Sequence, residues 1–71
     1  MIYILAYRTD RVLNIRLTDI WLFRICDHLI DLGYELKSGS ENHWKRMIDE
    51  YGRPTFTYDL SDEDTFFDVG Q

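Results

Sequence analysis

The sequence predicts a small single α+β domain, in which an N-terminal β-hairpin and a C-terminal strand form an antiparallel sheet packed on two helices. Three observations predict it. Apolar residues alternate on both sides of a polar RTDR segment near the N-terminus, two later segments show helical periodicity, and alternation returns in residues 55–60. We therefore expect one domain over residues 1–71, with residues 61–71 as an acidic terminal turn or tail.

The hairpin of residues 2–7 and 12–17 is predicted by a register that gathers aliphatic side chains on one face. If Tyr7 faces Val12, this face receives the pairs Ala6 with Leu13, Ile4 with Ile15 and Ile2 with Leu17. The opposite face is mixed, which suits partial exposure, and it carries Tyr3, Leu5, Tyr7, Val12, Asn14 and Arg16. Because Thr-Asp is not a favoured two-residue turn, we expect a longer or bulged loop.

The first helix is predicted over residues 19–32. Thr18 is a suitable N-cap and Gly33 a suitable C′ residue. One apolar stripe comprises Leu22, Ile25, Cys26, Leu29 and Leu32. Trp21, Phe23 and Ile30 widen this stripe beyond one face, so we expect the helix to be central to the core or covered by another subunit.

The second helix is predicted over residues 41–51, after Ser40 as its cap. Its apolar positions follow i, i+3, i+4, i+7 spacing at Trp44, Met47, Ile48 and Tyr51. Residues 34–40 before it are expected to form a short extended or irregular connection. Residues 55–60 after it alternate as a half-buried strand does.

Size and motif content argue against an enzyme. A chain of 71 residues has little apolar surplus for an enclosed active site. Cys26 and His28 are two residues apart on a helix and point in different directions, which argues against a catalytic thiol-imidazole dyad. No zinc spacing, calcium loop or glycine-rich phosphate motif occurs, so we expect no metal and no cofactor.

The compartment is predicted from cysteine use and hydropathy. Cys26 is the only cysteine, which indicates a reducing environment, and we expect a cytoplasmic protein. The apolar N-terminus lacks the pattern of a signal peptide, and Arg24 and Asp27 interrupt the other apolar run. We expect no membrane association.

The negative charge is concentrated at the C-terminal end. The formal net charge is -5, and acids and bases balance from Met1 to Arg53. The excess therefore falls on Asp59, Asp62, Glu63, Asp64 and Asp68. We predict that these acids bind a protein with a basic surface, with Phe66 or Phe67 as an apolar anchor; the alternative is that Phe66 and Phe67 close the domain's own core.

In size and charge the chain is similar to small acidic phage inhibitors of host nucleases and defence complexes, anti-CRISPR proteins among them. This similarity implies that the target handles nucleic acid and that the carboxylates block its phosphate-binding groove by charge mimicry.

The sequence leaves two alternatives to binding of a basic protein target. The apolar helix could make the chain a structural or self-associating subunit, with a homodimer formed through Trp21 and Phe23. A nucleic-acid-binding hairpin face would combine Tyr3, Tyr7 and Arg16, with Arg8 and Arg11 near the turn. The net negative charge argues against direct nucleic-acid binding.

Overall fold

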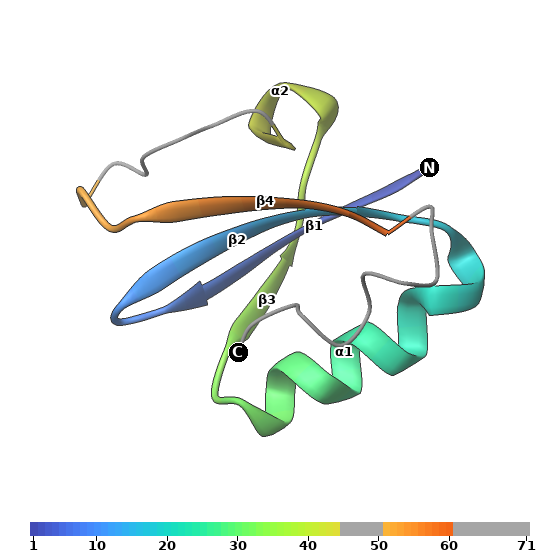
Figure 1. Ribbon diagram of the computed structural model, residues 1–71, viewed down its shortest axis with the longest axis horizontal. Helices are drawn as coiled ribbons and strands as arrows, with labels where there is room; N and C mark the ends of the chain where they lie inside the picture. Colours follow the sequence, from blue (N-terminus) through green and yellow to red (C-terminus); the bar gives the residue numbers. More distant parts are fainter. Residues whose placement is uncertain (45–50, 61–71) are drawn as a thin grey trace.

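The computed structural model describes residues 1–44 and 51–60, which form a four-stranded sheet with helical segments on its two faces (Figure 1). The order of strands across the sheet is β3-β1-β2-β4. The elements in chain order are β1 (Ile2–Arg8), β2 (Arg11–Leu17), η1 (Asp19–Trp21), α1 (Leu22–Asp31), β3 (Glu35–Ser38), α2 (Glu41–Trp44) and β4 (Thr55–Leu60).

The hairpin register is confirmed. β1 and β2 pair antiparallel with Tyr7 opposite Val12 and Ile2 opposite Leu17, as the clustering of aliphatic side chains predicts. The expected longer loop is wrong, because pairing continues to Arg8 opposite Arg11 and leaves a two-residue turn. Ionic contacts within this turn, described below, stabilise it without a residue in the left-handed region.

The predicted fold class is wrong in two respects. The sheet is mixed, because β4 pairs parallel to β2, and residues Glu35–Ser38 of the expected connection form a fourth strand, antiparallel to β1. β3 and β4 occupy opposite edges of the sheet, so the chain crosses the sheet between them. After this crossing, β4 runs in the same direction as β2. Local alternation specifies a strand but not the neighbour with which it pairs.

The second error concerns the helices. The described residues contain one substantial helix, in which a 3-10 turn of 3 residues leads into the 10 residues of α1. Of the predicted helix 41–51, α2 provides Glu41–Trp44, and residues 45–50 lie outside the described part. The prediction of a sheet packed on two helices is therefore wrong for the described residues, and Figure 1 shows α1 and the short α2 on opposite sides of the sheet.

The main core lies between the sheet and α1. Ile25 and Leu29 of α1 are fully buried, and Trp21 packs in the same cluster. The sheet contributes Ile4, Ala6, Leu13, Ile15, Leu17 and Leu60. At about 25 cal/mol per Å² of apolar surface, this burial is the largest favourable contribution to folding.

The ends of the helical segment agree with their predicted positions. Gly33 follows the last turn with φ of 87°, where a left-handed conformation favours glycine, and its N–H donates to the Ile30 carbonyl at 3.0 Å. Thr18 is the N-cap, but its hydroxyl makes no capping hydrogen bond and is buried without a partner. The position of the N-cap was predictable from the sequence, whereas the absence of a capping hydrogen bond from its side chain was not.

Candidate protein-binding surface

The outer face of the continuous helical segment formed by η1 and α1 carries large apolar side chains in contact with solvent. Phe23 is 80% exposed, Ile20 is 72% exposed and Ile30 is 58% exposed. With Asp27, these residues follow i, i+3, i+7, i+10 spacing and therefore lie along one side of the helix. We call Ile20, Phe23 and Ile30 the outer apolar stripe.

This stripe exists because the helix is apolar around most of its circumference. Trp21, Ile25 and Leu29 point into the core, as an amphipathic helix on a sheet requires. The aliphatic and aromatic residues of the stripe gain nothing from this packing, since they lie on the opposite side. Exposed aromatic side chains close to other apolar groups are typical of protein-binding surfaces.

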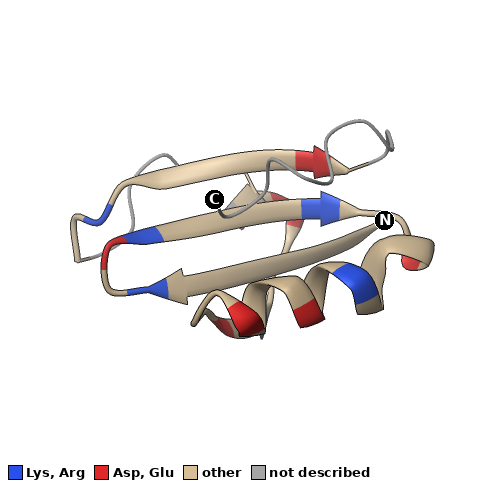
Figure 2. Cartoon of the chain, turned by 60° about the horizontal axis from the view of Figure 1, so that its bottom comes forward, with Lys and Arg blue, Asp and Glu red and all other residues tan. Residues whose placement is uncertain are grey.

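Acidic residues flank the outer apolar stripe. Asp19, Asp27 and Asp31 are all exposed, while Arg24 is the only lysine or arginine between Asp19 and Asp31. Figure 2 shows acidic positions, in red, at intervals along the helical segment. The Arg24 guanidinium lies 5.6 Å from the Trp21 ring centre, so it covers the edge of the core. The surface therefore combines apolar contact area with net negative charge.

An apolar groove of about 360 Å³ lies beside the stripe, between α1 and strands β1 and β3. Its apolar lining includes Ile2, Ile4, Leu22, Cys26 and Leu36. Cys26 precedes Ile30 by four residues and follows Phe23 by three, so the groove continues onto the outer apolar stripe. Burial, with a smaller effect of Asp27, raises the pKa of the Cys26 thiol, which keeps it protonated and apolar at neutral pH.

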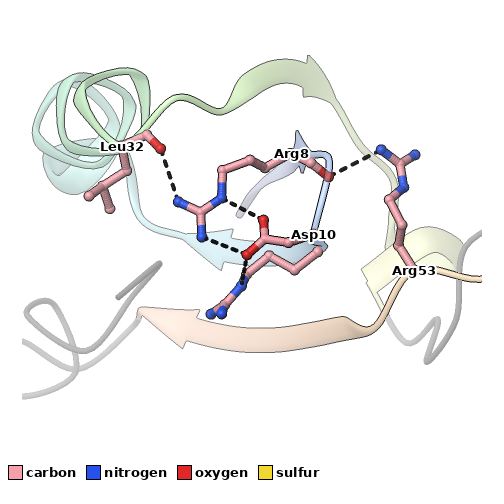
Figure 3. Close-up of polar contacts among 5 residues, drawn as sticks. Arg8, Asp10, Leu32 and Arg53 are labelled. Atoms are coloured by element: carbon pink, nitrogen blue, oxygen red, sulfur yellow. Dashed lines mark hydrogen bonds and ion pairs between the residues drawn. The ribbon is translucent and has the colours of Figure 1, made fainter.

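The hairpin turn holds a cluster of charges that stabilises the fold (Figure 3). The Arg8 guanidinium donates to both carboxylate oxygens of Asp10, at 2.6 and 3.0 Å, and to the Leu32 carbonyl at the end of α1, at 3.0 Å. Arg11 donates to Asp10 at 3.3 Å, and Arg53 donates to the Arg8 carbonyl at 3.2 Å. These contacts join the turn to the end of α1 and to the segment before β4.

The carboxylate of Asp10 gives this cluster a pH dependence. The hydrogen bond from Arg8, with the charges of Arg8 and Arg11, lowers the pKa of Asp10 to about 2. A lowered folded-state pKa stabilises the fold above the unfolded pKa of about 3.9, and this stabilisation is lost as pH falls towards 2.

We expect Asp10→Asn to lower the free energy of unfolding at pH 6. The difference in this free energy from the wild type should narrow below about pH 4 and close only as the pH falls through about 2. Urea denaturation of both proteins across this range measures the gap, and a carboxyl NMR titration of the wild type measures the pKa. An equal gap at pH 6 and pH 2 would show that the ion pairs do not act through this ionisation.

The aromatic and basic hairpin face proposed for nucleic acid is engaged within the chain. Tyr7 is half-buried, with Lys37 and Arg53 at 5.3 and 5.4 Å from its ring centre. Arg16 pairs with Asp59 at 3.7 Å and lies 5.2 Å from the Trp44 ring centre. Stacking on a base would have to displace these cations, because they already lie near the aromatic rings.

The structure describes only one of the predicted partner-binding residues, and the prediction that they bind a partner stays a prediction. Asp59 lies in β4 and forms the ion pair with Arg16, so it is part of the sheet surface. Asp62, Glu63, Asp64, Phe66, Phe67 and Asp68 lie outside the described residues. The structure separates Trp21 from Phe23, since the first is buried and the second exposed.

Sequence reasoning missed the groove and the exposure of Ile20. The excess width of the apolar stripe was the one available signal. It singled out Trp21, Phe23 and Ile30, of which Trp21 is buried and the other two are exposed. The groove has no local signature, since its lining comes from three elements far apart in the sequence.

Comparison with known proteins gives no further assignment. Residues 1–44 and 51–60 contain no helix long and apolar enough to cross a membrane, and no cluster of three or more potential metal-ligating residues occurs among them. No family model, curated protein or solved structure matches the chain significantly.

Proposed function

We propose that this chain acts in the cytoplasm by binding another protein through the outer apolar stripe of α1. The observation that carries the proposal is the 80% exposure of Phe23 on a helix whose opposite side already fills the core. Buried aromatic side chains at the centre of an interface supply much of its binding energy. Phe23 is therefore the expected anchor, with Ile20 and Ile30 on either side.

The partner's chemistry follows from the charges around the stripe. Asp19, Asp27 and Asp31 favour a partner whose apolar contact surface is bordered by lysine or arginine. The net charge of -5 favours the same partner at longer range and speeds its association. A second copy of the chain is a poorer fit, because like charges would oppose each other.

Charge mimicry of nucleic acid is a more specific form of this proposal. Asp62, Glu63, Asp64 and Asp68 would extend the negative surface, and a basic target that grips nucleic acid would then be inhibited by competition for its phosphate-binding groove. Support comes from the concentration of charge in the sequence.

A capture experiment tests the proposal. The immobilised full chain is exposed to a bacterial lysate, retained proteins are identified, and their binding to the purified chain is measured. We expect Phe23→Gln to weaken binding about thirtyfold or more, because hot-spot side chains contribute about 2 kcal/mol or more. Tyr51→Gln is the matched control, since Tyr51 is 76% exposed elsewhere on the surface.

Charge variants distinguish binding by the acids beside the outer apolar stripe from mimicry by the C-terminal acids. Asp27→Asn with Asp31→Asn should weaken binding if the partner's basic rim meets α1. Amides at Asp62, Glu63 and Asp64 should weaken it, with a reduced dependence on salt, if mimicry operates. Equal binding by the Phe23→Gln and Tyr51→Gln variants would overturn the proposal, and dimerisation abolished by Phe23→Gln would reassign the stripe to self-association.

A further inference from the structure

The outer edge of β3 has no strand beside it among the described residues. β3 is the first strand in the sheet order, and β1 is its only neighbour there. α1 lies closer to β3 than to the other strands, so the groove opens near this edge. An edge strand with apolar surface beside it is a template for one more strand.

The ladder with β1 shows which backbone groups face outward. The Gly39 N–H donates to the Tyr3 carbonyl at 2.8 Å, and Tyr3 continues the register in which Leu5 faces Lys37. In an antiparallel ladder, alternate residues direct their polar groups to the same neighbour. Lys37 and Gly39 therefore face β1, whereas Leu36 and Ser38 direct their N–H and C=O groups to the open edge.

The side chains of Leu36 and Ser38 lie on the groove side of the sheet, and both line the groove. An added strand would place every second side chain on this same side. These side chains would meet Leu22 and Cys26, the residues through which α1 lines the groove. The edge of β3 would bind the backbone of the added strand through main-chain hydrogen bonds, and the groove would select for apolar side chains on it.

We propose that an extended segment of the partner protein adds to the edge of β3 and inserts alternate apolar side chains into the groove. This inference rests on the proposed function, because the added segment belongs to the partner that binds the outer apolar stripe. Asp19 of η1 and Asp27 of α1 select a segment that also carries lysine or arginine. A second copy paired edge to edge about a twofold axis would instead bring the acids of two α1 helices together.

The test uses a displayed library of random linear peptides selected on the full chain. We expect enriched peptides to alternate apolar residues with positions rich in lysine or arginine. Ser38→Pro removes one outward N–H and spares the ladder to β1, so it should weaken a selected peptide about fivefold, the effect of losing one hydrogen bond. Ser38→Ala is the matched control, because it removes the same hydroxyl but keeps the outward N–H. The difference in affinity between the two variants therefore measures the lost main-chain hydrogen bond.

Cys26 provides an independent readout, because it is the only thiol in the chain and lines the groove. Saturation with a selected peptide should slow alkylation of Cys26 by N-ethylmaleimide at least about tenfold. Thermal unfolding of the Ser38→Pro and Ser38→Ala variants establishes that both are folded at the assay temperature.

Several outcomes would overturn the inference. These are a library without enrichment, enrichment of i, i+3, i+4 apolar spacing, equal binding by the two Ser38 variants, or alkylation unaffected by peptide. Dimerisation abolished by Ser38→Pro would assign the edge to a second copy. If Phe23→Gln abolishes capture of the partner while Ser38→Pro binds it as Ser38→Ala does, the proposed function stands and strand addition fails.

Discussion

Trp21→Ala should lower the free energy of unfolding by about 3–5 kcal/mol, whereas Phe23→Ala should change it by no more than about 0.5 kcal/mol. Trp21 is 8% exposed and belongs to the core cluster, so its truncation loses apolar burial and leaves a cavity. Phe23 loses little, because its ring is already in water. Urea denaturation followed by circular dichroism measures both variants without relying on tryptophan emission.

This pair distinguishes stability from binding at neighbouring positions. If Phe23 proved as destabilising as Trp21, its side chain would be packed in the folded protein and the proposed surface would be withdrawn. If Phe23→Ala is stable and loses the partner, the outer apolar stripe is a binding surface rather than part of the core.

Leu60→Ala should lower the free energy of unfolding by about 2–5 kcal/mol, the usual range for a leucine truncated in a core. Leu60 is fully buried at the end of β4, opposite Leu17 in the parallel register. Phe56→Ala is the matched control on the same face of the same strand. Phe56 is 42% exposed, so we expect a loss of at most about 1 kcal/mol despite its contact with Arg11 at 5.4 Å.

The comparison of Leu60 with Phe56 tests the parallel placement of β4. Parallel pairing puts Leu60 beside the buried end of β2 and Phe56 near the turn, where Arg11 lies. Chemical denaturation of the two variants under one set of conditions gives the difference. A larger loss at Phe56 than at Leu60 would contradict this arrangement.

The candidate surface was partly predictable because helical spacing reports which residues share a face. Phe23 and Ile30 could be identified as surplus to a single core-facing stripe, and Thr18 and Gly33 marked the ends of the helical segment. The assignment of Trp21 to the same surface as Phe23 was wrong. The initial 3-10 turn and the position of the helix beneath the sheet direct Trp21 into the core.

The opposite face of the sheet was also harder to predict. Leu5, Val12 and Asn14 were expected to be partly exposed, yet all three are buried. Part of this burial comes from Gly39, where an added Cβ would lie 3.2 Å from the Leu5 side chain. Trp44 contributes nearby by donating to the Tyr58 carbonyl at 3.3 Å.

The sequence by itself determined the hairpin register, the ends of the helical segment and the presence of a strand over residues 55–60, because each depends on periodicity or end chemistry within a short segment. The tertiary structure decided the mixed sheet, the edge position of β3 and the groove beside α1. These depend on contacts between distant segments, and many pairings satisfy the same local pattern. The proposed binding surface depends on both. The outer apolar stripe follows from local helical spacing, whereas the edge of β3 beside the groove forms only when the strands assemble.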